Sequence, residues 1–254
     1  MTQFIDQLPT ILGVEATAAV SCRGLFVPTR ALPPVLARSV RPLVFENFSE
    51  YRFSMRGSCT LIRCNQIHLV IFTEHQRQDA SPAQIRVVSG FEGGNCLVCE
   101  TFLEVKKLEG EEYEDLRGLK IATARHSPEE LKDFFPLSHA PPIESSRILI
   151  AVGLPSKHSG VDYDPTNVRG ATITIPCSYE GLSTHVRGFH RVRMKTLPGH
   201  ENYPVDGLSG GAMFSVDGTP GNYQANIRGI ILRGGRGLLH YVDIAAVEYM
   251  ASQA

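Results

Sequence analysis

The sequence has almost no net charge and no long apolar run. Its 25 basic and 26 acidic residues leave a formal charge of −1, which gives no bulk attraction for nucleic acid or for an anionic membrane. No stretch of about 18 apolar residues is present that could span a bilayer. Residues 1–12 contain an acid and a proline where a secretory signal would have basic residues and then an apolar run. We therefore expect a soluble, cytoplasmic protein with no nucleic-acid or membrane partner.

The six cysteines are scattered and suggest no cross-linked framework. Cys96 and Cys99 form a lone Cys-x-x-Cys pair, without a second pair or a histidine at zinc-finger spacing. Since residues three apart on a strand point to opposite faces, we interpret most of the cysteines as small buried hydrophobic side chains in a reducing compartment. A redox or zinc role for the pair is the alternative. We expect no metal and no cofactor.

A serine between glycines lies near the C-terminus, in the run Gly207-Leu208-Ser209-Gly210-Gly211. A nucleophilic serine needs a tight turn, little bulk beside it, and backbone N–H groups free to face a developing oxyanion. Short Gly/Ser runs are also common in ordinary turns. The case for a nucleophile therefore depends on a base and an acid elsewhere in the chain.

Candidates for both groups lie upstream of the serine. The apolar run 67–72 predicts a buried strand that ends next to His75, the candidate base. Asp115 stands just before the β-like stretch 116–121, where a partly buried carboxylate could hold an imidazole in one tautomer. Taken alone, one of nine histidines is an ordinary core or surface side chain, and Asp115 is an ordinary turn residue. The chain order His, Asp, Ser strengthens the assignment of both candidates, because different triad enzymes use different orders.

Five short motifs in this order resemble those of one family. They are Gly-Ser-Cys-Thr-Leu-Ile at 57–62, Thr-Glu-His at 73–75, Asp-Leu-Arg-Gly-Leu-Lys-Ile at 115–121, Ala-Val-Gly-Leu-Pro at 151–155 and Gly-Leu-Ser-Gly-Gly at 207–211. The family is that of the chymotrypsin- and trypsin-like serine peptidases, in its bacterial intracellular form. The resemblance covers roughly residues 55 to 250, and the spacing of the three candidate residues also suits it.

The resemblance implies an all-β fold with two six-stranded antiparallel β-barrels and a C-terminal helix. With 254 residues, 43% of them hydrophobic, the chain is long enough for two such barrels. We expect an N-terminal extension over 1–50, a first barrel over 51–135 with His75 and Asp115, and a second barrel over 136–254 with Ser209. Prolines in the first 50 residues favour an extended arm or small extra elements over a helix.

Short runs of alternating or continuous apolar residues predict the individual strands. For the first barrel they are 59–64, 67–72, 85–89, 96–103 and 116–124, and for the second 147–153, 171–176, 188–195, 211–216, 227–233 and 238–242. A capping-box pattern predicts a short helix over 127–135, which we interpret as the linker between the barrels. A closing helix is expected over 244–250.

The resemblance implies a serine endopeptidase. His75 would accept the proton of Ser209, Asp115 would stabilise the imidazolium, and the N–H groups of Gly207 and Ser209 would form the oxyanion hole. The substrate is then a protein or peptide. The residues expected to contact that substrate are Tyr203, Asp206, Leu232, Arg233 and Gly234. No aspartate stands at the trypsin-like pocket floor, so basic, apolar and acidic side chains all stay open as preferences, with a non-tryptic pocket favoured.

Three positions depart from the family pattern. Leu208 replaces the aspartate that pairs with a newly cut N-terminus in zymogen-type members, so we expect Leu208 to be buried under the turn or at an interface. Control would then come from an activating partner or a loop rearrangement. Gln76 replaces the cysteine that secreted relatives pair with the preceding strand. Glu74 replaces a small apolar residue beside the histidine.

Two other functions compete with the peptidase. One is a catalytically silent trypsin-like binding or scaffold module, which active-site serine labelling would distinguish. The other is a non-proteolytic acyl hydrolase, but that chemistry uses the chain order Ser, Asp, His. The resemblance also allows a role as a partner-activated effector in bacterial stress or anti-phage systems.

Overall fold

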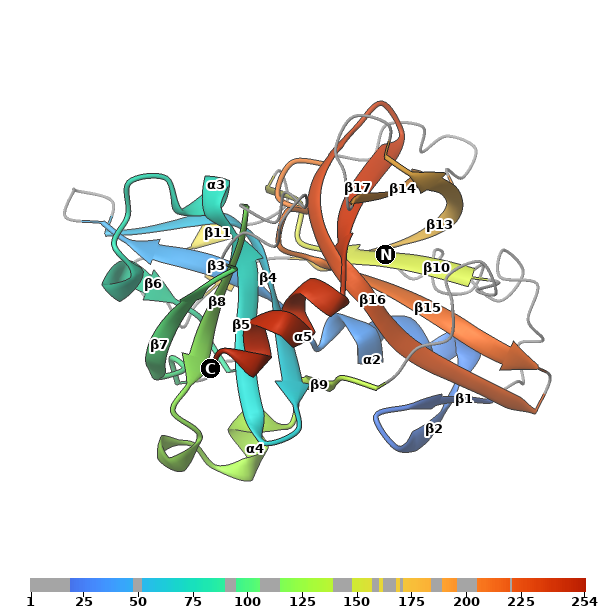
Figure 1. Cartoon of the computed structure of the whole chain (residues 1–254), viewed down its shortest axis with the longest axis horizontal. Helices are drawn as coiled ribbons and strands as arrows, with labels where there is room; N and C mark the ends of the chain where they lie inside the picture. Colours follow the sequence, from blue (N-terminus) through green and yellow to red (C-terminus); the bar gives the residue numbers. More distant parts are fainter. Residues whose placement is uncertain are drawn as a thin grey trace.

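The computed structural model describes residues 19–47, 52–89, 95–105, 115–138, 148–156, 160–161, 168–169, 171–183, 189–195, 205–219 and 221–254. Within these residues the chain is mostly β, and two curved sheets stand side by side (Figure 1). The α-helices are short: α2 (Leu32–Ala37), α3 (Glu74–Arg77), α4 (Pro128–Leu131) and α5 (Ala245–Ser252). Single 3-10 turns occur at Thr29–Ala31, Pro82–Gln84 and Thr123–Arg125. None of the helices in the described part of the chain has the length and apolar character needed to cross a bilayer.

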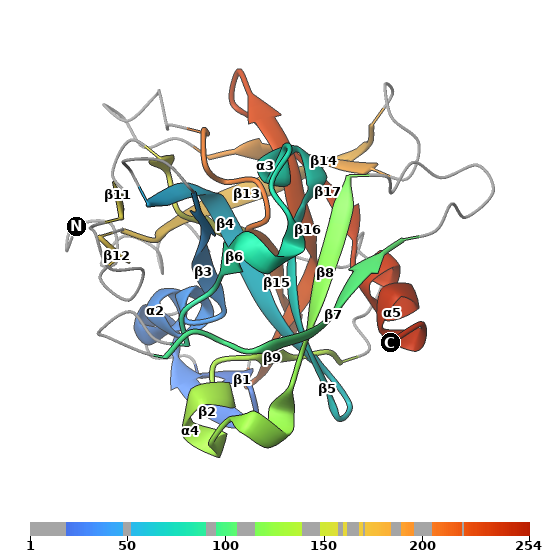
Figure 2. The same ribbon diagram turned by 90° about the vertical axis from the view of Figure 1, so that its left-hand side faces the viewer.

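The first sheet has the strand order β6-β3-β4-β5-β8-β7, and β9 pairs with β4 in parallel (Figure 2). Its strands are β3 (Val40–Glu46), β4 (Phe53–Cys64), β5 (Ile67–Thr73), β6 (Ile85–Arg86), β7 (Cys99–Glu104), β8 (Leu116–Ile121) and β9 (Phe135–Pro136). The sheet curls into a half-barrel. A bridge between Val88 and Cys96 joins the segment after β6 to the segment before β7.

The second sheet closes into a six-stranded barrel, because β15 pairs with β16 as well as with β10. Its strands are β10 (Ile148–Gly153), β13 (Ile173–Leu182), β14 (Phe189–Met194), β15 (Ala212–Thr219), β16 (Asn222–Gly235) and β17 (Leu238–Asp243). A separate pair is formed by β11 (Gly160–Val161) and β12 (Val168–Arg169). The expected chymotrypsin-like fold is confirmed, with one closed barrel and one half-barrel where two closed barrels were expected.

Alternate residues of the central strands face different apolar cores. On β5, Val70 and Phe72 face the core inside the first barrel, whereas Leu69 and Ile71 face a cluster between the two barrels. Because successive side chains on a strand point to opposite faces, a strand covered on both sides has a continuous apolar sequence. This explains the unbroken apolar run 69–72. The same holds for β10, where Ile150 belongs to the cluster between the barrels and the neighbouring positions 149 and 151 to the core of the second barrel.

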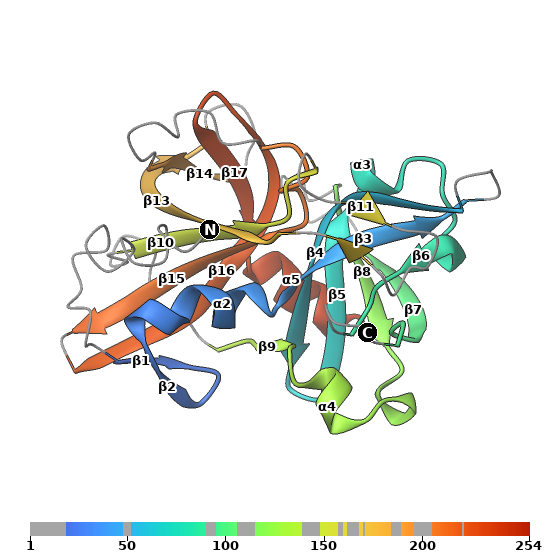
Figure 3. The same cartoon turned by 180° about the vertical axis from the view of Figure 1, so that it is seen from behind.

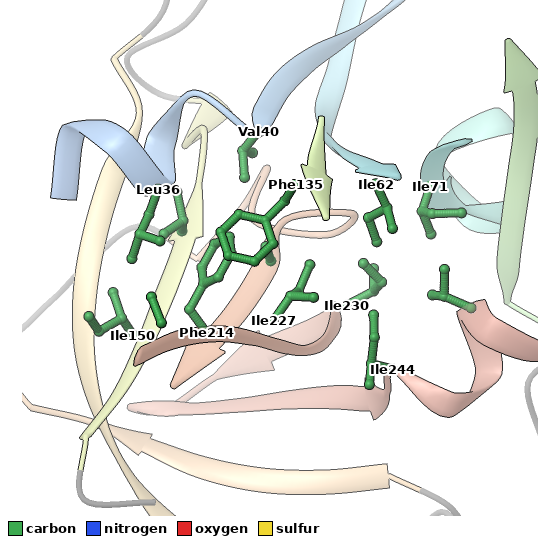
Figure 4. Packing of buried hydrophobic residues seen from close by; sticks show 14 of the residues in the cluster. Leu36, Val40, Ile62, Ile71, Phe135, Ile150, Phe214, Ile227, Ile230 and Ile244 are labelled. Atoms are coloured by element: carbon green, nitrogen blue, oxygen red, sulfur yellow. The ribbon is translucent and has the colours of Figure 1, made fainter. Parts of the chain in front are cut away.

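The cluster between the barrels, here called the interbarrel cluster, joins both sheets. Figure 4 shows Ile62 of the first sheet facing Ile230 of the second, with Ile71 and Ile227 of the same cluster on either side. The rings of Phe135 and Phe214 also meet there, with centroids 5.0 Å apart. This apolar contact fixes the two barrels against each other, so that residues from both can build one site.

Each end of the described chain packs on the opposite barrel. The hairpin of β1 (Ala19–Cys22) and β2 (Leu25–Pro28) extends the second sheet, with β1 parallel to β16. Helix α5 follows the last strand of the second barrel but lies beside the first sheet (Figures 1 and 3). A Cβ atom at Gly118 of β8 would collide with the sulfur of Met250, and Lys120 donates to the carbonyl of Ala254 at 3.1 Å.

The N-terminal region differs from the expected extension. β3 lies inside residues 1–50, yet it pairs with β4, so the first sheet begins before residue 51. Pro42 lies at a register shift of β3, where a missing N–H is tolerated. Helix α2 forms although prolines argued against a helix, because Pro33 and Pro34 occupy its first turn, where the N–H groups need no helical partner.

The expected linker helix is shorter than predicted. Ser127 caps α4, and its backbone N–H donates to Glu130 Oε2 at 2.9 Å, as the capping-box pattern predicted. The helix ends at Leu131, and the following residues return to the first sheet as β9. The described residues 115–138 therefore stay with the first barrel. The C-terminal helix, predicted over 244–250, is observed as α5.

Candidate functional site

The structure brings His75 and Asp115 together at one end of β5 and β8. The two strands are antiparallel, and Thr73 pairs with Leu116, so the residues that follow Thr73 and precede Leu116 are neighbours. Asp115 Oδ2 lies 2.7 Å from His75 Nδ1, and Asp115 Oδ1 accepts the backbone N–H of His75 at 3.0 Å. The backbone N–H of Glu74 donates to the Asp115 carbonyl at 2.7 Å. The carboxylate therefore fixes both the imidazole and the peptide that carries it.

Glu74 does not disturb this pair, although it replaces the small residue of the family pattern. Its carboxylate is held by two guanidinium groups, those of Arg77 and Arg117. The Arg117 contact is 2.8 Å, from Nε to Glu74 Oε2. The hydrogen bond to Glu74 also raises the pKa of Arg77. The side chain of Glu74 is thus committed to a local ion-pair cluster.

Ser209 lies in the described segment 205–211 just before β15, here called the serine turn, on the second barrel. Its hydroxyl donates to the carbonyl of Leu232 at 2.8 Å. His75 Nε2 lies 3.3 Å from Thr73 Oγ1. Both Ser209 and His75 belong to the described residues, and no hydrogen bond joins their side chains there. A transfer of the Ser209 proton to His75 therefore requires the serine side chain to leave Leu232 first.

The carbonyls of the serine turn are held by β4 of the first sheet. Ser58 Oγ donates to the Gly207 carbonyl at 2.7 Å, and Ser58 N donates to the Ser209 carbonyl at 3.1 Å. Thr60 Oγ1 donates to the Gly210 carbonyl at 2.7 Å. Since these carbonyls are turned toward β4, the peptide groups of the turn have a fixed direction. Among the described residues, the N–H groups of Gly207 and Ser209 have no acceptor, as an oxyanion hole requires.

Two glycines of the turn have no room for a side chain. Gly207 has φ +91°, and a Cβ atom there would lie 2.5 Å from the Leu154 carbonyl and 2.6 Å from Ser156 N. Gly210 has φ +78°, and a Cβ atom there would collide with the Ser58 carbonyl. Both positions require glycine for conformation and for space. An ordinary surface turn does not require glycine for both reasons, so these two glycines indicate a turn with one closely defined shape.

Leu208 is buried within the chain, with 1% of its surface exposed. It belongs to the core of the second barrel, and a Cβ atom at Gly153 would lie 2.7 Å from Leu208 Cδ2. The expectation of a buried Leu208 is confirmed, and the packing partner is the chain itself. An apolar contact within the second barrel therefore holds position 208 of the serine turn.

The residues expected to contact substrate are partly placed. Leu232, Arg233 and Gly234 lie on β16; Leu232 is buried, and the other two are exposed. The Arg233 guanidinium lies over the ring of Phe189, 5.4 Å from its centroid. Asp206 is exposed, and its carbonyl accepts Ser156 N at 2.8 Å. Tyr203 lies outside the described residues. Contact of these residues with a substrate stays a prediction.

The cysteines and acids of the described residues do not gather into a metal site. Within the described ranges, no group of three or more His, Cys, Asp or Glu side chains is placed to hold a metal ion. All six cysteines lie in those ranges and are free thiols. Cys22, Cys59 and Cys177 are buried, and burial raises the pKa of Cys22 to about 11. A thiol with so high a pKa is a poor nucleophile near neutral pH.

Comparison with known proteins supports the fold. No protein-family model matches the sequence, and no curated protein matches it. Among solved structures, the chain is similar to a thermostable serine protease, AL20, from an extremophilic microorganism. The TM-score is 0.52 at 13% sequence identity, over 87% of this chain and 98% of the other. The chain therefore has the double-barrel fold of chymotrypsin-like serine proteases, and its own chemistry is a matter for proposal.

Sequence reasoning missed the residues that hold the serine turn. Ser58 and Thr60 are two apart on β4 and therefore face the same side of the strand. The available signal was this pair of hydroxyl residues at alternate positions, just before the apolar residues 61–62. Gln76 was noted only for the absent cysteine. Its side chain is almost fully buried and contacts both Thr73, the N-cap residue of α3, and the serine turn.

Proposed function

We propose that this chain is a serine endopeptidase that cleaves protein substrates through His75, Asp115 and Ser209. The observation that carries the proposal is the double contact of Asp115 with His75, through Nδ1 at 2.7 Å and through the backbone N–H at 3.0 Å. A carboxylate on Nδ1 leaves Nε2 as the basic nitrogen. The turn of Ser209, with two N–H groups that have no acceptor among the described residues, supplies the second half of such a site.

The proposed reaction begins when the Ser209 side chain turns from the Leu232 carbonyl toward His75. As Ser209 Oγ attacks the substrate carbonyl, its proton passes to His75 Nε2, and Asp115 stabilises the imidazolium. The oxygen of the tetrahedral intermediate accepts hydrogen bonds from the N–H groups of Gly207 and Ser209. The imidazolium then protonates the leaving amine, and the C–N bond breaks to leave an acyl-enzyme. Water, deprotonated by His75, hydrolyses the ester and restores Ser209.

A catalytically silent module with this fold is the second candidate, and one observation favours it. The Ser209 hydroxyl is bonded to Leu232, and His75 Nε2 faces Thr73 Oγ1. In a silent module this arrangement would be permanent. In a peptidase it is a resting state that substrate displaces, since catalytic hydrogen bonds of free enzymes are often formed only in the complex.

Labelling with a fluorophosphonate probe separates the two candidates. The probe phosphonylates a serine that an adjacent base activates, so a peptidase gains the mass of the probe at Ser209. The Ser209→Ala variant is the matched control and must stay unlabelled. Incubation with a peptide library, again with Ser209→Ala as control, then reads out the cleaved bond. A chain that is folded but unlabelled is a silent module.

We propose further that the protein works in a reducing, cytoplasmic compartment. Support comes from six thiols that are all free, three of them buried in apolar cores. An activating partner, and a role in bacterial stress or anti-phage defence, are proposals that rest on the family resemblance. Because Leu208 is buried by the chain itself, such a partner is not required to cover it. Activity of the purified chain without additions would show that no partner is needed.

A further inference from the structure

Gln76 is the third residue of α3, the helix that also carries His75, and its side chain is buried against the serine turn. Its exposed surface is 3%, and both ends of its amide are used. The oxygen Oε1 accepts the N–H of Thr73 at 2.8 Å and the hydroxyl of Thr73 at 2.9 Å. The nitrogen Nε2 faces three carbonyls, those of Ser209 at 2.9 Å, Ser58 at 3.0 Å and Arg56 at 3.2 Å. Only this orientation of the amide matches donors with acceptors.

The surroundings of Gln76 are shaped to admit the amide. Gly57 has φ +122°, and a Cβ atom there would lie 2.5 Å from Gln76 Nε2. On the other side, a Cβ atom at Gly210 would lie 2.9 Å from Gln76 Oε1. Glycines on two different barrels therefore make room for one side chain. Such close packing holds the amide in a single position.

The helix that carries His75 depends on this amide. α3 has only four residues, too few to be stable by itself. The bond from Thr73 N to Gln76 Oε1 closes its first turn, and the bonds from Nε2 attach it to β4 and to the Ser209 carbonyl. We propose that Gln76 is a positioning residue that couples the base-bearing helix α3 to the nucleophile turn. The proposal rests on the proposed peptidase function and adds a residue to its site.

Gln76 also directs the hydroxyl of Thr73. Thr73 Oγ1 lies 2.9 Å from Gln76 Oε1 and 3.3 Å from His75 Nε2. Because an amide oxygen only accepts, the Thr73 proton is directed to Gln76 and does not occupy Nε2 of a neutral imidazole. The basic nitrogen stays available for the proton of Ser209. Without the amide, the hydroxyl would donate to Nε2 and compete with the serine.

The test compares Gln76→Met with Gln84→Met in the full chain. Methionine keeps the unbranched shape of glutamine but removes its hydrogen bonds. Gln84 is a matched control, since its Oε1 accepts Ser81 N at 2.8 Å in a second capping box and its Nε2 donates to the Glu46 carbonyl at 2.8 Å, away from Ser209. We measure the rate of phosphonylation of Ser209 and, by mass spectrometry, hydrogen exchange of the amides at 205–211.

Gln76→Met is expected to label about 100-fold more slowly than the wild type, since a small misplacement of reacting groups costs about that factor. Exchange at 205–211 is expected to accelerate, because the Ser209 carbonyl loses one of its donors. Gln84→Met is expected to match the wild type within about twofold, as a surface change far from reacting groups. Wild-type rates for Gln76→Met, or equal losses in both variants, would overturn the proposal.

Gln76→Glu adds a readout that a purely structural role would not change. The carboxylate that this substitution introduces would place an acceptor oxygen where Nε2 now faces three carbonyls. Its protonated form would restore one donor at that position. The ratio of the Gln76→Glu and Gln76→Met labelling rates is expected to rise as the pH falls, because protonation of the introduced carboxyl restores a donor to the serine turn. A ratio independent of pH would refute the proposed donor role.

The exchange measurement separates this proposal from the proposed function. If the wild type is folded but never labels, the peptidase assignment fails, and exchange alone decides the coupling. Faster exchange at 205–211 in Gln76→Met, with Gln84→Met unchanged, supports the link between the helix and the turn. Unchanged exchange in both variants overturns it whether or not the wild type is an enzyme.

Discussion

Replacing Leu208 with alanine tests whether apolar packing holds the serine turn. Burial of Leu208 is nearly complete, and it packs on Gly153, where backbone atoms limit any collapse of the cavity. Leucine-to-alanine changes at such sites cost about 2–5 kcal/mol, and a site that cannot collapse belongs in the upper half, about 3–5 kcal/mol. At about 2–4 °C per kcal/mol for a chain of this size, the melting temperature should fall by roughly 10 °C.

The assay must follow backbone structure, since the sequence has no tryptophan. Urea unfolding monitored by far-ultraviolet circular dichroism gives the free energy of unfolding, and phosphonylation without urea gives the reactivity of Ser209. Leu149→Ala is the matched control, because Leu149 lies in the same core but on β10. We expect both variants to lose stability and only Leu208→Ala to lose reactivity.

Two outcomes would refute this reasoning about Leu208. A loss of stability below about 1 kcal/mol would mean that the side chain does not support the turn. An equal loss of reactivity in Leu208→Ala and Leu149→Ala would mean that the serine responds to general loosening of the barrel. In either case the packing of Leu208 would not be what orders the turn that carries Ser209.

Three further predictions concern the triad, the thiols and activation. Ser209→Ala and His75→Ala should abolish peptide cleavage without lowering the melting temperature by more than a few degrees, and Asp115→Asn should reduce the rate by about 10⁴-fold through the wrong imidazole tautomer; turnover near that of the wild type in any of them would contradict the triad. Dithiothreitol should leave the melting temperature nearly unchanged, since the six described cysteines are free thiols; a fall of many degrees would show a disulfide that matters in solution. An N-terminal tag that cannot be removed should leave Ser209 reactivity intact, because Leu208 offers no carboxylate to a freed amine; inactivity of the tagged chain that specific clipping relieves would reveal an amine-driven switch.

The central strands could be predicted because their burial is recorded in local sequence. The run 69–72 is apolar throughout, since this part of β5 is covered on one face by the first-barrel core and on the other by the interbarrel cluster. The ends of such strands also locate His75 and Asp115, and the structure brings these two residues into contact. Their catalytic roles, and that of Ser209, stay predictions.

Features that depend on distant pairing could not be predicted. β3 contains Pro42, which argues against a strand until the partner β4 supplies the register shift that accommodates it. β1 is extended only because β16, some 200 residues later, offers it an edge. In the site, the hydrogen bond from Gln76 to Ser209 joins residues of different barrels, and no local pattern encodes such a contact.

Each end of the described chain packs on the opposite barrel, and this limits which gene fusions of the two barrels could fold. A gene fusion that joined its first barrel to the second barrel of a relative would separate β1 and β2 from β16, and α5 from β8. Each half would lose an element supplied by the other half of the chain and would expose apolar side chains where that element had been. The two barrels therefore have to be exchanged together in such a fusion, even though each has a core of its own.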